Sequence, residues 1–220
     1  MKKNKKYEKA FFIQRVIAYI VDMFLVMLIS SLLTTPFVNG ETVTKLSNES
    51  NQVIENYANG KIDAKTYFSQ VIDISYEEMK VTGLANIITI TIVVLYFIVF
   101  QTYNNGQTLG KRLMRIKVMK KNNKDLTMND MILRNLFTNS ILADILIVTI
   151  TLFGKSAYFY GSTIVRLLQY LFILITFFMI IIRKDGRGLP DMIAKTKVVS
   201  LLIKVEDEEL ETEEENLCES

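Results

Sequence analysis

The chain has 220 residues, of which 50% are hydrophobic, and its formal net charge is +3. It has no histidine, which removes the commonest general base and metal ligand, and a single cysteine, Cys218, which excludes an internal disulfide framework. The apolar residues are gathered in blocks, which is typical of a membrane protein rather than of a soluble domain.

The first apolar block covers residues 11–35 and is long enough to cross a bilayer as a helix. It contains Arg15 and Asp22, which lie on the same side of a helix because seven residues make nearly two turns. A basic start, residues 1–10, resembles a signal peptide, but the length and charges of the block predict an uncleaved span. Asp22 falls near the membrane midplane, where a charge costs at least about 2.5–3.5 kcal/mol and should therefore face protein or water.

Three further apolar blocks predict spans over residues 81–103, 131–153 and 162–182, with a tight connection at 154–161. Residues 36–80 are polar, with four lysines and seven acids, and we expect an outside loop. Its helical periodicity is weak and limited to short stretches.

Basic residues set the expected topology. Residues 104–130 hold seven basic residues and two acids, and residues 183–204 are basic again. Basic segments stay in the cytoplasm, so both termini and the 104–130 loop are predicted inside. Residues 113–119 and 197–203 have strand character and would pair there. The predicted fold class is an all-α membrane protein, a four-transmembrane-helix bundle with a small cytoplasmic β element. The acidic tail, 205–220, is predicted to be disordered.

Polar side chains within the spans form the candidate site. Counted by helical rise, Asp22, Asp144 and Gln169 reach similar depths, so they could meet near mid-bilayer. Two carboxylates that close would not both stay ionised, which is a way to hold and release a proton or a small cation. A satisfied polar network that fixes helix register is the other interpretation of the same residues.

Two arginines lie closer to the cytoplasmic boundary. Arg15 can pair with Asp22 or with Asp191, or can extend to the headgroups. Arg134 occupies the equivalent level on the third span and has two interpretations, an ion pair or a contact with lipid phosphate.

Three motifs, in this order, resemble one family. They are RVIAYIVD (15–22), GQTLGKR (106–112) with IKV (116–118), and RGLPD (187–191). Together they resemble the RDD family of small bacterial membrane proteins, which is named for an arginine and two aspartates. Arg15, Asp22 and Asp191 match those positions, over a resemblance from about residue 11 to 199. Family members often have histidine before the last aspartate, where this chain has Pro190.

The resemblance implies a multi-pass protein of the bacterial cell membrane, and some members are thought to exchange sodium or potassium for protons. We therefore expect transport of a monovalent cation coupled to protons. Asp22 would be the central carboxylate, Asp144 and Gln169 would help to bind, and Arg15 with Asp191 would form a gate. Four spans are few for alternating access, so transport predicts a homodimer.

The alternative expectation is a non-transporting scaffold or accessory subunit that binds a partner or anionic lipid through its basic face. An enzyme is disfavoured because the spans carry no histidine or cysteine. We expect no metal, no cofactor and no nucleic acid. A phosphate loop at Gly106 to Lys111 is rejected, since the glycine spacing is one residue short and Arg112 replaces the required hydroxyl residue.

Overall fold

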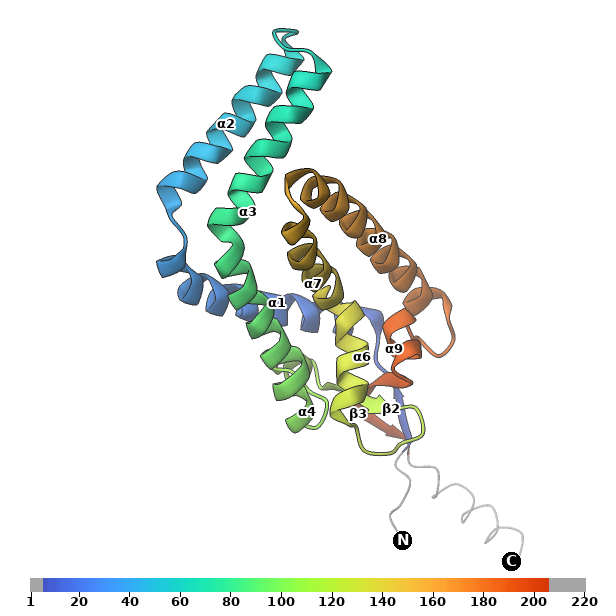
Figure 1. The fold of residues 1–220 in the computed structure, drawn as a ribbon. Coiled ribbons are helices and arrows are strands. Elements are labelled where there is room, and N and C mark those ends of the chain that lie inside the picture. Colours follow the sequence, from blue (N-terminus) through green and yellow to red (C-terminus); the bar gives the residue numbers. More distant parts are fainter. Residues whose placement is uncertain (1–5, 206–220) are drawn as a thin grey trace, which may run out of the picture.

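The computed structural model describes residues 6–205, which form an elongated molecule with a helical hairpin at one end, a helical bundle in the middle and a small sheet at the other end (Figure 1). The acidic tail predicted to be disordered lies outside the described residues, apart from Val205. In chain order the elements are β1 (Lys6–Lys9), α1 (Phe12–Thr34), η1 (Thr35–Phe37), α2 (Gly40–Ala58), α3 (Ala64–Val94), η2 (Leu95–Phe100), α4 (Gln101–Tyr103), α5 (Leu109–Leu113), β2 (Ile116–Lys120), α6 (Met128–Thr138), α7 (Ile141–Ile150), η3 (Thr151–Phe153), α8 (Lys155–Ile182), α9 (Leu189–Ile193) and β3 (Thr196–Val205).

Three continuous helical stretches are long and apolar enough to cross a membrane. They are Phe12–Phe37, Ala64–Tyr103 and Lys155–Ile182, and the bent pair α6 and α7 makes a fourth if it is counted as one span. The outward faces carry large apolar side chains such as Phe24 and Leu167, each about three-fifths exposed. Such faces are suited to lipid rather than water, which supports the predicted membrane protein, with three to four candidate spanning helices.

The third predicted span is not one straight helix. Residues 131–153 were predicted to cross continuously, but α6 and α7 meet at an angle of 68°. The break lies at Asn139 and Ser140, and Ser140 has a left-handed backbone with φ 59°. A left-handed residue ends an α-helix, and hydropathy alone contains no signal for it.

Most of residues 36–80 is helical, where a polar loop with only short helical stretches was predicted. Helix α2 pairs with the first half of α3, and this hairpin extends beyond the bundle (Figure 1). Each helix starts with a side-chain cap: Asn39 accepts from the backbone N–H of Thr42, and Asp63 from that of Thr66. The rings of Tyr57 and Tyr67 stack at 4.6 Å between centroids and join the two helices.

Helix α8 also begins earlier than predicted. It starts at Lys155 rather than at residue 162, directly after Gly154, whose φ of 93° makes the turn from α7. The connection predicted over 154–161 therefore shrinks to one residue. Lys155 forms an ion pair with Asp73 of α3, which joins the start of α8 to the hairpin.

The sheet has three antiparallel strands in the order β1-β3-β2. The pairing predicted between the segments 113–119 and 197–203 is confirmed, with Ile116 opposite Ser200 and Lys120 opposite Thr196. Strand β1 was not predicted, because the lysines of residues 1–10 indicate only a basic N-terminus. The first and last described strands thus lie side by side at one end of the molecule.

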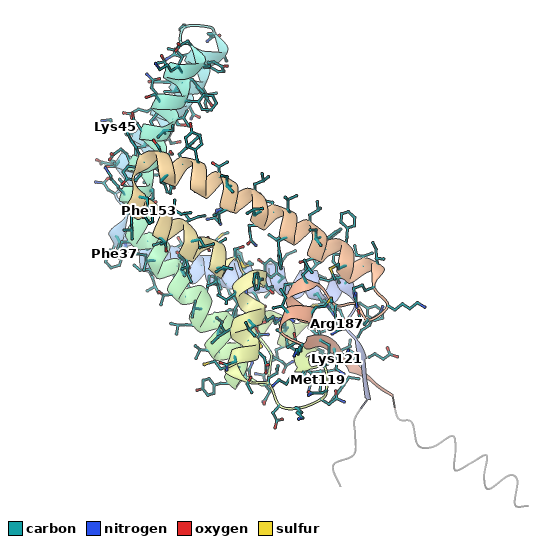
Figure 2. All side chains as sticks on the ribbon, turned by 45° about the vertical axis from the view of Figure 1, so that its right-hand side comes forward. Phe37, Lys45, Met119, Lys121, Phe153 and Arg187 are labelled. Atoms are coloured by element: carbon teal, nitrogen blue, oxygen red, sulfur yellow. The ribbon has the colours of Figure 1, made fainter. Side chains whose placement is uncertain are left out.

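The best-packed core lies where the sheet meets the bundle rather than in the middle of the bundle. Its buried apolar residues come from α1, η2, β2, α6, α7, β3 and the residue directly after β1, and they are Ala10, Ala18, Ile98, Ile116, Val118, Met131, Ile141 and Val198. By contrast, no residue of α8 is buried. Figure 2 shows Phe37 and Phe153 where the bundle meets the hairpin, and Lys121 and Arg187 at the sheet end.

Candidate functional site

Asp22 is the most enclosed acid among the described residues, with 1% of its surface exposed. Its Oδ1 accepts hydrogen bonds from the Tyr96 hydroxyl at 2.7 Å and from the backbone N–H of Gly110 at 2.8 Å. Its Oδ2 accepts from the Thr108 hydroxyl at 2.5 Å. These three donors replace the water that a carboxylate needs, so Asp22 is satisfied without a bound cation.

Two of the three partners of Asp22 come from the start of α5, which packs directly on α1. Thr108 is the N-cap of α5, and Gly110 lies in its first turn. A Cβ on Gly110 would come within 2.2 Å of the Ala18 carbonyl oxygen and 2.8 Å of Asp22 Oδ1. Only glycine permits this approach, and the carboxylate then faces free N–H groups at a helix start, a favourable place for a negative charge.

The π-helical segment η2 places the third donor. Tyr96 lies within this segment and also accepts a hydrogen bond from the backbone N–H of Leu109 at 3.1 Å. The wider turn of a π-helix disrupts the usual backbone bonding, and the side chain of Asn135 on α6 donates to the Phe97 carbonyl at 2.8 Å. The irregular turn thus connects η2 to α6.

Asp191 is held between two arginines and is 3% exposed. Its Oδ2 accepts from Arg15 Nη1 at 3.3 Å and from the backbone N–H of Gly188 at 3.2 Å, and its Oδ1 is paired with Arg134 Nη1. Arg15 also donates to the Val198 carbonyl, and Arg134 to the Thr196 hydroxyl. Asp191 thus joins α9 to α1 and α6, and its two arginine partners extend this network to β3.

A cavity of about 220 Å³ lies beside this ion cluster. Its charged lining residues are Arg15, Lys111, Arg134 and Asp191, and its amide residues are Asn135 and Asn139. Positive charge exceeds negative charge in the lining. Burial lowers the pKa of Lys111 to about 7, an effect that the positive charge of Arg134 strengthens and the negative charge of Asp22 opposes.

Asp144 lies in a second and larger cavity, of about 440 Å³, between α3, α7 and α8. Its carboxylate pairs with Arg166 of α8 at 2.9 Å, and its side chain is 28% exposed. Oxygen-bearing side chains also line this cavity, among them Asn86, Thr89 and Thr151. Asp144 has fewer partners than Asp22 or Asp191 and more open space in front of it.

The structure brings together only part of the predicted site. Arg15 pairs with Asp191, which was one of its two expected partners, but no contact joins it to Asp22 among the described residues. Arg134 forms an ion pair, which favours that interpretation over a lipid contact. The meeting of Asp22, Asp144 and Gln169 is not found among residues 6–205, since Asp22 and Asp144 have separate partners.

Gln169 lines a third, largely apolar cavity of about 180 Å³, and its buried Nε2 has no hydrogen-bond partner within residues 6–205. Sequence reasoning did not identify Tyr96, Thr108, Gly110 or Lys111 as site residues. A partial signal was present, because Thr108 opens a short helix as an N-cap residue within the GQTLGKR motif. No group of three potential acid, histidine or cysteine metal ligands occurs in the described part of the chain.

The RDD family model matches residues 9–195, which is most of the chain and includes Arg15, Asp22 and Asp191. Neither the curated proteins nor the solved structures contain a match to this chain.

Proposed function

The chain belongs to the RDD family, and we propose that it exchanges a monovalent cation for protons across a membrane, with Asp144 as the carboxylate that alternates between them. The observation that carries this proposal is the place of Asp144. It faces a cavity of about 440 Å³ and has Arg166 as its one described partner. Arg166 is 46% exposed along its side chain, so it has room to move aside when a cation arrives.

The lining of this cavity suits a hard cation, which prefers oxygen ligands. Asn86 and Thr89 of α3 and Thr151 of η3 supply side-chain oxygens on the walls around Asp144. Intramembrane acids that face open space are functional candidates because a charge there is expensive to keep. The bend of 68° between α6 and α7 adds support, since broken helices are common at transporter binding sites.

The two aspartates at the family positions, Asp22 and Asp191, are poor sites for cation exchange. Asp191 already faces Arg15 and Arg134, so an incoming cation would be repelled by the excess positive charge. Asp22 has three donors directed at its two oxygens, and a cation would have to displace them. We therefore propose Asp144 rather than Asp22 as the carboxylate that exchanges the cation for protons. The ion pair of Arg15 with Asp191 is then a structural contact rather than a gate.

Localisation and assembly are parts of the same proposal. The sheet end carries basic residues, Lys117, Lys120, Lys121 and Arg187, and basic segments stay in the cytoplasm. We therefore propose that both termini lie on the cytoplasmic side of a bacterial cell membrane. A chain with three to four spans is small for alternating access, and a homodimer would supply the second half.

The test is proton flux in proteoliposomes that contain a pH-sensitive dye. Addition of sodium or potassium should drive proton movement with the unaltered chain. Asp144→Asn should abolish this flux, because the amide of Asn takes up no proton near neutral pH and has no negative charge to attract a cation. Asp73→Asn is the matched control, since Asp73 also forms an ion pair with a basic residue of α8, Lys155, but is exposed in the hairpin. Flux that survives in Asp144→Asn would place the exchange elsewhere.

The second candidate function is a non-transporting scaffold or accessory subunit, favoured by the complete hydrogen bonding of Asp22. This function predicts no cation-dependent flux from the unaltered chain in sealed liposomes. It also predicts that Asp22→Asn lowers stability and changes nothing else, because the amide presents an N–H₂ group to one of three donors.

A further inference from the structure

The cavity of about 220 Å³ at the sheet end has a feature that the proposed exchange at Asp144 does not use. Three cationic side chains reach it from three elements: Arg15 from α1, Lys111 from α5 and Arg134 from α6. One carboxylate, Asp191, lines it with them. With Asp22 counted as a neighbour of Lys111, positive charge still exceeds negative charge at this place.

The cationic groups do not all have partners. Asp191 is shared by Arg15 and Arg134, while Lys111 forms no hydrogen bond or ion pair with any described side chain through its ammonium group. The Lys111 ammonium lies over the ring of Phe97, at 5.8 Å from the centroid. A partly buried cation with only a weak partner is costly unless an anion accompanies it.

Other buried polar atoms at the cavity also lack partners among the described residues. In the described part of the chain, Arg15 Nε is a buried donor without an acceptor, and Asn139 Oδ1 is a buried acceptor without a donor. The orientation of the Asn139 amide is fixed by its neighbour, since Asn139 Nδ2 donates to Asn135 Oδ1 at 2.8 Å and Asn135 Nδ2 donates to backbone carbonyls. Asn139 is 9% exposed, so nine-tenths of it is buried beside the cavity. A ligand with both anionic oxygens and a hydroxyl group would satisfy these atoms.

We propose that this cavity binds one tetrahedral oxyanion, with Lys111, Arg15 and Arg134 as its cationic partners. The volume is about seven times the 30 Å³ that a water molecule occupies in the liquid, which holds an oxyanion and a small substituent but not a whole lipid. Most of the remaining wall is apolar, with Phe12, Val16 and Ile180 from α1 and α8. The same chemistry is offered by a phosphodiester headgroup that enters from the bilayer and by a free oxyanion that enters from water.

The experiment measures the thermal unfolding midpoint of the purified full chain in neutral detergent, by circular dichroism. Sodium sulfate, with sodium chloride of equal ionic strength as the reference, tests the free oxyanion, and phosphatidylglycerol, with phosphatidylcholine as the reference, tests the headgroup. A rise with sulfate supports a free oxyanion, and a rise with phosphatidylglycerol alone supports a headgroup. If neither raises the midpoint of the unaltered chain, the proposal is wrong.

Lys111→Gln should remove the ligand-dependent rise, and Arg112→Gln should keep it. Arg112 is the matched control because it is the next residue of the same short helix and is exposed. An equal rise in Lys111→Gln and in the unaltered chain would mean general salt or lipid effects and would contradict the site. Native mass spectrometry of the unaltered chain gives a second measurement, because one retained phosphatidylglycerol per chain is expected and many weak adducts are not.

The binding should weaken with rising pH. The titratable and charged groups beside Lys111 are Asp22 of α1, which is hydrogen-bonded to Tyr96 of η2, and the cavity residues Arg15 and Tyr19 of α1, Arg134 of α6 and Asp191 of α9. Since the pKa of Lys111 is lowered to about 7, this lysine is charged at pH 6 and mostly neutral at pH 8.5. Affinity for phosphatidylglycerol, whose charge is constant over this range, should fall by up to about thirtyfold. The same affinity at both pH values would show that Lys111 takes no part.

Discussion

Asp191→Asn should destabilise the protein more than any other substitution proposed for this chain, by about 3–5 kcal/mol. The amide leaves Arg15 and Arg134 facing each other at a site where Asp191 is 3% exposed and Arg134 is 7% exposed. Two guanidinium groups without their shared anion repel each other, and water reaches them poorly. The measurement is unfolding in mixed micelles of neutral detergent and dodecyl sulfate, followed by loss of the helical circular dichroism signal.

The control for this change is Asp185→Asn, in the loop just before α9. Asp185 bonds to Arg183 and Arg187, and these hydrogen bonds keep the pKa of Asp185 well below its usual value. Because its side chain is 38% exposed, water and salt screen these pairs, and the loss should stay within about 1 kcal/mol. Equal losses in the two variants would mean that Asp191 is an ordinary surface ion pair.

Gly110→Ala should have the second-largest effect, a loss of about 1–3 kcal/mol or more. The added Cβ meets the Ala18 carbonyl oxygen at 2.2 Å, so α5 must move away from α1. That movement stretches the bond from the Gly110 N–H to Asp22 and weakens the bond from Thr108. A buried carboxylate then loses donors, which adds to the steric cost.

Gly83→Ala is the matched control for the glycine change. Gly83 lies inside α3, and a Cβ added there would meet no heavy atom within 4 Å, so alanine should stabilise the helix by about 0.5–1 kcal/mol. Both variants are compared by the same unfolding measurement. If Gly110→Ala is as stable as Gly83→Ala, the close packing of α5 on α1 is not what holds Asp22.

Some of this architecture follows from the sequence by simple physics. The block at residues 11–35 and helix α1 agree within a few residues, because a long apolar run with no proline has one stable form in lipid. The pairing of β2 with β3 was predictable because both segments alternate and follow spans at the same end. The contact of Arg15 with Asp191 was one of two expected pairings, since both residues lie near one membrane boundary.

Other features were beyond sequence reasoning for physical reasons. Depth by helical rise assumes straight and parallel helices, and the break at Ser140 removes that assumption for Asp144. The partners of Asp22 come mainly from a short helix outside the spans, so no count along a span would find them. The hairpin of α2 and α3 was within reach, because Asn39 and Asp63 are ordinary helix caps, but its weak apolar periodicity hid it.

The charged groups fall into two sets that lie in different parts of the molecule. Arg15, Asp22, Arg134 and Asp191 join the sheet end to the helical bundle through hydrogen bonds and ion pairs within the protein. Asp144 lies away from them in its own cavity with one partner. In our proposal the first group keeps the fold in place, and the second performs the exchange.

Proton release on cation binding tests this division most directly. Sodium or potassium chloride is added to the purified chain in weakly buffered detergent, and the pH is followed with choline chloride as the reference. We predict that the metal cation releases protons from the unaltered chain and from Asp73→Asn, and that Asp144→Asn releases none. Proton release that is unchanged in Asp144→Asn, or its absence from the unaltered chain, would contradict the assignment of exchange to Asp144.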